Sequence, residues 1–211
     1  MKGEGEDMNK TTSGASEIFI PRPDPEQLCK YRNQWEHLEK YPPQEKAIRR
    51  LFRQIAPENE EITDVLLKVA VLNAFYSTNL YDAFSVALHI QNLHIDKLLK
   101  LGDVALVEKL RYIHLNGRTR DCYSFATKYC HCHSPLVFPI YDRYVDKMLC
   151  YFGKHDRFAD FREKDLKDYR RLKEILENFR AYYGLDSYTL EDLDKYLWLL
   201  GKEYLPKKLN K

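Results

Sequence analysis

Apolar side chains recur every three or four residues through most of this chain, and no stretch alternates between apolar and polar residues as a half-buried strand does. Helical spacing places such residues on one face, which can pack against a core. Asp24, Asp103 and Thr189 are expected N-caps, and Gly102 an expected helix end. The pattern predicts an all-α fold, with helices over about 25–41, 48–56, 63–76, 81–90, 98–99, 103–110, 119–132, 141–152, 164–182 and 189–204.

Three segments refine this pattern. Pro42 and Pro43 are expected to end the first helix, because proline disfavours helix continuation. The segment 63–76 is apolar nearly all round, which predicts the central buried helix. Asn116-Gly117 is a turn signal.

The length and composition suit one domain. With 211 residues and 44% hydrophobic content, the chain can bury a core in one globular unit or in two lobes that share a cleft. Residues 1–17 have almost no large apolar side chain, so a disordered lead is expected there, followed by a single domain over 18–211.

Bulk charge and cysteine use exclude several classes of protein. Charged residues make up 31% of the chain but cancel to a net +2, so any nucleic-acid surface must be a local patch. Five cysteines form an odd set without a hydrophobic leader, which predicts reduced thiols in a cytoplasmic protein. No apolar run approaches membrane-spanning length, so no membrane partner is expected.

A lysine and an aspartate are the main candidates for catalysis. Lys128 lies in an otherwise apolar helical segment, where burial would lower its pKa and favour a nucleophilic amine, although a snorkelling or ion-paired lysine is the alternative. Asp142 precedes the stripe of Val145 and Met148 at a helix start. It is either an ordinary N-cap or a carboxylate that stabilises positive charge on a sugar or orients a water. The turn that contains Pro139 is expected to bring the two side chains together.

The sequence offers no convincing cofactor site. Cys130, His131, Cys132 and His133 are adjacent on a predicted helix and would point in four directions, which does not suit zinc. A glycine-rich loop for nucleotide phosphates is also absent from the sequence. We therefore expect no metal and no nucleotide cofactor.

Several segments from about residue 60 to the end resemble the helix-hairpin-helix (HhH-GPD) DNA glycosylases, and most closely the bacterial 8-oxoguanine DNA glycosylase-fold proteins. They are VLLKVAVLNA at 65–74, SFATK at 124–128, FPIYD at 138–142, DRYVDK at 142–147 and DKYLWLLGK at 194–202. The resemblance implies a two-lobed helical fold with a cleft between the lobes. It implies a base pocket formed by Phe75, Tyr76, Ser77, Thr78 and Tyr144.

The resemblance also implies a function. The protein would flip a damaged base, with an oxidised purine among the candidates, out of double-stranded DNA and excise it as a monomer. Asp142 would stabilise the oxocarbenium-like sugar, and Lys128 would attack C1′ to form an imine. Lyase activity stays open, because Lys128 lies further along its helix than the lysine of the family's bifunctional members.

The family's phosphate-binding hairpin is altered here. The family carries two glycines in this hairpin, whereas this chain has one, Gly117, beside arginines. Arg118, Arg120 and Arg143 are the candidates for phosphate contacts. This departure and the near-neutral charge favour an alternative, a non-catalytic helical module that binds nucleic acid or protein and kept the fold. A purely structural adaptor would place Lys128 and Asp142 far apart or bury them in unrelated ion pairs.

Overall fold

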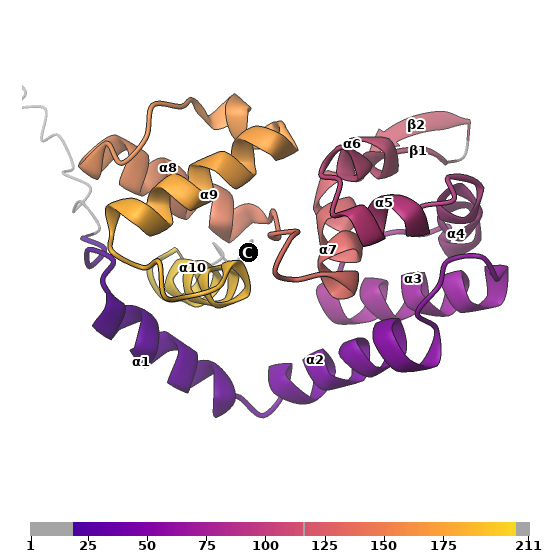
Figure 1. Cartoon of the computed structure of the whole chain (residues 1–211), viewed down its shortest axis with the longest axis horizontal. Coiled ribbons are helices and arrows are strands. Elements are labelled where there is room, and N and C mark those ends of the chain that lie inside the picture. Colours follow the sequence, from indigo (N-terminus) through magenta and orange to yellow (C-terminus); the bar gives the residue numbers. More distant parts are fainter. Residues whose placement is uncertain (1–18, 116, 206–211) are drawn as a thin grey trace, which may run out of the picture.

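The computed structural model of the chain describes residues 19–115 and 117–205, so the expected disordered lead at 1–17 lies outside the described residues. The described part is mainly helical, as predicted (Figure 1). The α-helices are α1 Pro25–Glu36, α2 Tyr41–Arg50, α3 Ile62–Tyr76, α4 Ala83–Asn92, α5 Asp96–Leu101, α6 Ala105–Arg111, α7 Tyr123–His133, α8 Arg143–Asp156, α9 Tyr169–Tyr182 and α10 Leu190–Tyr204. A π-helical turn, η1 Leu51–Ile55, and a 3-10 turn, η2 Glu163–Lys167, complete the helical elements of the described part.

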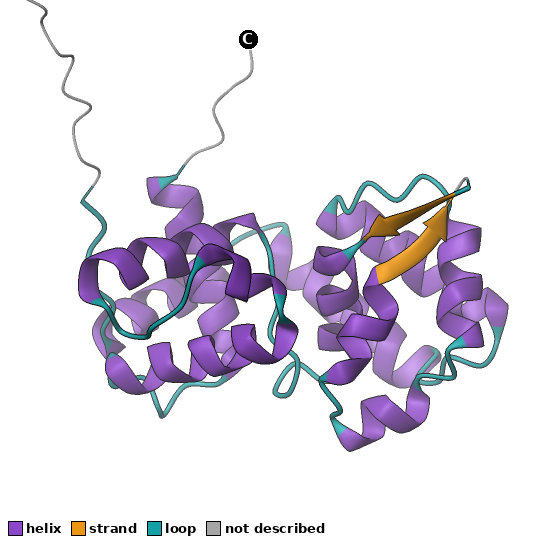
Figure 2. Ribbon diagram, turned by 90° about the horizontal axis from the view of Figure 1, so that it is seen from above, coloured by secondary structure: helices purple, strands orange, loops and turns teal. Residues whose placement is uncertain are grey.

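The expectation of no strands is wrong at one place. Strands β1 Tyr112–Leu115 and β2 Arg118–Asp121 pair antiparallel, with Leu115 opposite Arg118, so two residues connect them (Figure 2). Gly117 takes a positive φ of 75° in this connection, and Asn116 lies outside the described residues. The helix expected from Thr119 therefore begins only at Tyr123. A strand of four residues is too short for its alternation to stand out from a helical pattern.

Two predicted helix boundaries also differ. Pro42 and Pro43 occupy the first turn of α2, whereas α1 already ends at Glu36. Proline suits the first turn of a helix because the N–H that it lacks has no partner there in any case. The long charged helix expected from Lys164 is split into η2 and α9, and Asp168 caps α9 through the N–H groups of its first turn.

The helices form two groups along the long axis of the molecule. Helices α1, α8, α9 and α10 lie on one side in Figure 1, and α3 to α7 lie with the hairpin on the other. Helix α10 packs against α1 and α8, while α7 packs against α6. Gly201 allows the close approach of α8 and α10, because a Cβ there would lie 2.7 Å from the Cβ of Tyr144. The segment 134–142 crosses between the groups and delivers Asp142 to the start of α8.

Helix α3 is buried on one face only. Val65 and Val69 are fully buried, but Leu67 is 49% exposed, so the expectation of a helix buried all round is wrong. Lys68 is fully buried, and its Nζ donates to the carbonyls of Ala56 (3.1 Å) and Glu58 (2.6 Å) and to Oδ1 of Asn59 (2.7 Å). Burial lowers the pKa of Lys68 to about 8. This lysine satisfies the backbone acceptors at the end of η1, which is a structural role.

Within the described part of the chain, no helix has both the length and the apolar character needed to cross a membrane.

Candidate functional site

Lys128 is a buried amine on the inner face of α7. The residue is only 7% exposed, and its Nζ donates one hydrogen bond, to Oγ of Ser124 at 2.8 Å. Nζ also lies 5.5 Å from the ring centroid of Tyr76. No carboxylate within the described ranges forms an ion pair with Lys128. Burial lowers its pKa, and the charge of Asp142 and the thiol of Cys132 only partly oppose this effect, which raises the fraction of the neutral, nucleophilic amine.

Asp142 is the N-cap of α8. Its Oδ1 accepts the N–H groups of both Tyr144 (2.8 Å) and Val145 (2.9 Å). Oδ2 has no hydrogen-bond partner among the residues that the structure describes. The carboxylate is half-buried, and it is close enough to Lys128 to raise the pKa of that amine without pairing with it. Asp142 is therefore a cap that keeps one oxygen available.

The segment that carries Asp142 is held by three neighbouring helices. From α10, Oδ2 of Asp194 accepts the N–H of Ile140 at 2.9 Å. From α9, the hydroxyl of Tyr169 donates to the carbonyl of Pro139 at 2.8 Å. From α7, Oγ1 of Thr127 accepts the N–H of Tyr141 at 3.1 Å. These bonds fix the start of α8 relative to α7.

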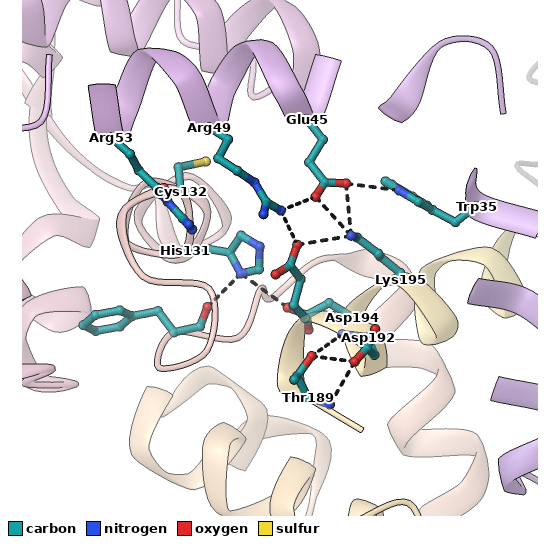
Figure 3. Close-up of polar contacts among 12 residues, drawn as sticks. Trp35, Glu45, Arg49, Arg53, His131, Cys132, Thr189, Asp192, Asp194 and Lys195 are labelled. Carbon is teal, nitrogen blue, oxygen red and sulfur yellow. Dashed lines mark hydrogen bonds and ion pairs between the residues drawn. The ribbon is translucent and has the colours of Figure 1, made fainter. Parts of the chain in front are cut away.

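Asp194 is a buried carboxyl that the sequence reasoning did not single out. Burial raises its pKa well above the usual range, and the nearby charge of Asp142 adds to this effect, while the N–H of Ile140 opposes it. Nδ1 of His131 donates to the carbonyl of Phe138 at 2.9 Å and lies 3.5 Å from Oδ2 of Asp194 (Figure 3). Glu191, Asp192 and Lys195 lie close to it in the sequence, so the local sequence does not distinguish Asp194 from its charged neighbours.

A network of charges joins α2 to α10. Glu45 and Arg49 of α2 meet Glu191 and Lys195 of α10, with Arg49 Nη2 3.0 Å from Glu191 Oε1 and Lys195 Nζ 3.0 Å from Glu45 Oε2 (Figure 3). Trp35 Nε1 also donates to Glu45 at 3.1 Å. Burial opposes ionisation of Glu45, but Lys195 and the other partners together lower its pKa. The sequence gives no sign of these pairs, because their partners lie more than 140 residues apart.

A cavity of about 450 Å³ brings four predicted site residues together, Ser77, Thr78, Arg120 and Lys128. Ser77 follows α3, Arg120 lies on β2, and Lys128 lies on α7. Asp142 is not among the lining residues. The remaining wall is formed by Asn79, Leu80, Asp121, Cys122, Tyr123, Ser124 and Phe125.

The other predicted base-pocket residues are dispersed. Tyr76 lies beside Lys128, and burial raises its pKa well above the usual range. Phe75 is partly buried against the core. Tyr144 is 9% exposed and faces Gly201 and Trp198 of α10, with a centroid distance of 6.4 Å to Trp198.

The three arginines predicted to contact phosphates also do not meet at one place. Arg118 and Arg120 are exposed on β2, and only Arg120 lines the cavity. Arg143 is exposed, and its guanidinium lies 5.0 Å from the ring centroid of Tyr144.

The run from Cys130 to His133 does not converge as a metal site. The thiols of Cys130 and Cys132 are buried in the core, and burial raises the pKa of Cys132 to about 12. Within the described ranges, the acidic trio Glu58, Glu60 and Asp96 is the only group of three potential ligands whose atoms lie close together.

The two histidines of this run predict acid sensitivity. Burial lowers the pKa of His131 to about 4 and that of His133 to about 3, below the ordinary value of 6.5. Between pH 6.5 and these values the unfolded chain binds more protons than the folded one, so stability falls as the pH falls. We expect His133→Phe to reduce the slope of unfolding free energy against pH by about 1.4 kcal/mol per pH unit between pH 6 and 4.

Urea unfolding at a series of pH values measures this slope. His114→Gln, at an exposed position on β1, is the matched control and should leave the slope unchanged. An unchanged slope in His133→Phe would show that His133 is not held neutral by the fold.

Comparisons with known proteins locate the chain among its relatives. A family model described as "HI_0787_N: N-terminal domain" matches residues 27–137, more than half of the chain. An uncharacterized protein of Haemophilus influenzae is 47% identical over 150 residues, which cover 71% of this chain and 72% of that relative. No solved structure matches.

Proposed function

We propose that this chain, which belongs to the HI_0787_N family, is a DNA glycosylase that flips a damaged base from double-stranded DNA and excises it. The relative is uncharacterized, so the proposal depends on the residues of this chain. The observation that carries it is the buried amine of Lys128, which has no ion-pair partner among the described residues, at the wall of a cavity of about 450 Å³. A cavity of this size suits a ligand as large as a nucleoside.

The proposed mechanism assigns separate roles to the two groups. Asp142 uses Oδ1 for capping, and its second oxygen would stabilise the positive charge that develops on the sugar or orient the attacking water. Lys128, as a neutral amine, would attack C1′ and form an imine, which adds strand-nicking activity. The amine and the carboxylate stay out of ion-pair contact, so neither is neutralised by the other.

The same proposal includes the arrangement of the molecule on DNA. The two groups of helices in Figure 1 would form two lobes on the DNA, and the flipped nucleotide would enter the cavity beside Lys128, which lies within the group of α3 to α7. Arg118 and Arg120 project from the exposed hairpin and would contact phosphates. The protein would act as a cytoplasmic monomer.

One observation favours a second candidate, a helical module that binds nucleic acid or protein without catalysis. Asp142 makes the two hydrogen bonds of an ordinary N-cap and does not line the cavity. A non-catalytic module of this kind would bind its partner through surfaces such as the hairpin and leave DNA chemically unchanged.

A panel of duplexes, each with one damaged base, separates the two candidates. We expect the protein to release the base from at least one lesion class, with oxidised purines included, and abasic sites are scored by cleavage in hot alkali. An undamaged duplex of the same sequence is the control. Tight binding of duplexes without release of any base would favour the non-catalytic module.

A further inference from the structure

We propose that Asn73 is a positioning residue for the cavity beside Lys128, because its side chain fixes the loop 77–80 that forms one wall of that cavity. The inference rests on the proposed function, in which this cavity receives the flipped nucleotide, and it names a residue that sets how tightly the nucleotide binds. Asn73 lies in the last turn of α3 and is not among the residues that line the cavity.

The side chain of Asn73 makes three hydrogen bonds with this loop. Its Nδ2 donates to the carbonyl of Leu80 at 3.0 Å, and its Oδ1 accepts the N–H of Leu80 and the hydroxyl of Thr78, both at 2.9 Å. Within the described ranges, residues 77–80 make no hydrogen bond with any other residue. One side-chain amide therefore takes the place of the backbone bonds that commonly follow a helix ending in the left-handed region.

The backbone of the loop needs this support. Ser77, which ends α3, has a φ of 50°, and Asn79 has a φ of 56°, so two residues with side chains lie in the left-handed region. This region is disfavoured for residues that have a Cβ. Without the bonds from Asn73, only the buried side chain of Leu80 would anchor the loop. We therefore expect the loop to leave this conformation when Asn73 is replaced.

The loop also determines which groups the cavity offers to a ligand. Residues 77–80 form one wall, and the rest of the lining comes from β2, the start of α7 and the residues between them. Ser77 and Asn79 line the cavity, and their side chains make no hydrogen bond among the described residues. A hydroxyl and an amide can bind the polar edge of a base, which has both donors and acceptors. A displaced loop would carry both groups away from the base.

The test replaces Asn73 with leucine, which has a similar volume and cannot form the three hydrogen bonds. We expect KM for base release from the damaged duplex to rise about tenfold, because the loop would hold the binding conformation in about a tenth of the molecules. We expect kcat to change by less than about twofold, since Lys128 and Asp142 lie on α7 and at the start of α8. A loss of folded protein alone would lower kcat and leave KM unchanged.

Two further variants complete this comparison. Asn92→Leu is the matched control, because Asn92 is the last residue of α4, is exposed and makes no side-chain hydrogen bond within the described ranges. It should leave KM and kcat unchanged. Asn73→Asp keeps the Oδ1 acceptor and loses only the donor to the carbonyl of Leu80, so KM should rise by a smaller factor. This variant decides the matter if Asn73→Leu does not fold.

Amide hydrogen exchange tests the loop without any substrate. The N–H of Leu80 is bonded to Asn73, so its exchange should be about tenfold or more faster in Asn73→Leu, and unchanged in Asn92→Leu. Asn73→Asp should keep most of the protection, because its carboxylate still accepts this N–H. The amides of Val69 and Leu72, in the buried part of α3, report on the fold and should exchange at the normal rate in every variant.

The outcomes separate this inference from the proposed function. Normal exchange of the Leu80 amide in Asn73→Leu, or an unchanged KM, would overturn the positioning role of Asn73. Fast exchange in this variant, together with no base release by the unchanged protein from any duplex, would support the role of Asn73 in the cavity wall and reject the proposed function instead.

Discussion

Replacing Asp142 with asparagine is expected to lower the rate of base release by about 10³-fold, the range for loss of a group that stabilises charge in a transition state. The fold should survive, because asparagine caps helices as well as aspartate does. Its side-chain oxygen can still accept the N–H groups of Tyr144 and Val145, which Oδ1 accepts in the unchanged protein. What is lost is the negative charge on the second oxygen. Single-turnover release from the lesion that the duplex panel identifies measures the effect.

Asp168→Asn is the matched control for this experiment. Asp168 caps α9 through the N–H groups of Arg170 and Arg171 in the same hydrogen-bond pattern, but its carboxylate is exposed, whereas that of Asp142 is half-buried and close enough to Lys128 to raise the pKa of that amine. This variant should release base at the normal rate. Normal release by Asp142→Asn would show that Asp142 is only a cap.

Asp142→Asn should still form the imine between Lys128 and DNA that already contains an abasic site. The charge of Asp142 raises the pKa of Lys128, so its removal leaves a larger neutral fraction of the amine at neutral pH. Loss of both activities together with unchanged folding would contradict separate roles for the two residues.

Features that depend on near neighbours in the sequence could be predicted. Asp24 and Thr189 cap α1 and α10 through their side chains, and Gly102 ends α5 with a φ of 65°. Each of these depends on the chemistry of one residue and on the apolar spacing that follows or precedes it. The mainly helical class follows from the same local patterns.

Features that depend on tertiary contact could not be predicted. Leu67 is exposed and Lys68 buried on α3, because the acceptors for Lys68 lie on a turn that folds back over that face. The hairpin replaces the start of an expected helix, since the N–H of Cys122 bonds the carbonyl of Arg111 across its base. Neither partner is indicated by the local sequence.

Some predicted residues of the candidate site meet in the structure, and others are held elsewhere by tertiary contacts. Lys128 and Tyr76 lie together, and Ser77 and Arg120 line the cavity beside them, so two segments far apart in sequence, 76–80 and 120–128, meet there. Tyr144 faces α10 instead, because Gly201 lets the two helices approach closely enough for its ring to pack there. Its position two residues after Asp142 in the sequence gave no information about the direction of the ring.

Replacing Lys128 with methionine is expected to reduce the borohydride-trapped adduct with abasic DNA to background. Methionine conserves the volume of the buried side chain and removes the amine, so the cavity wall should keep its shape. Lys128 donates to a single hydroxyl, that of Ser124, and its ammonium form has no counter-ion in the described part of the chain. The variant should therefore unfold at the same or a higher temperature, because a buried polar group with one hydrogen bond is replaced by an apolar side chain of similar volume.

Lys68 provides the internal comparison for this last experiment. It is the other buried lysine of the described residues, but its Nζ donates to three oxygen acceptors, and it is not among the residues that line the cavity. Peptide mapping of the unchanged protein should locate the adduct at Lys128 and leave Lys68 unmodified, since burial alone does not give access to a substrate. An adduct that persists in Lys128→Met, at any lysine, would remove Lys128 as the nucleophile. A stable, correctly folded variant without adduct would locate imine formation at the amine that faces the cavity.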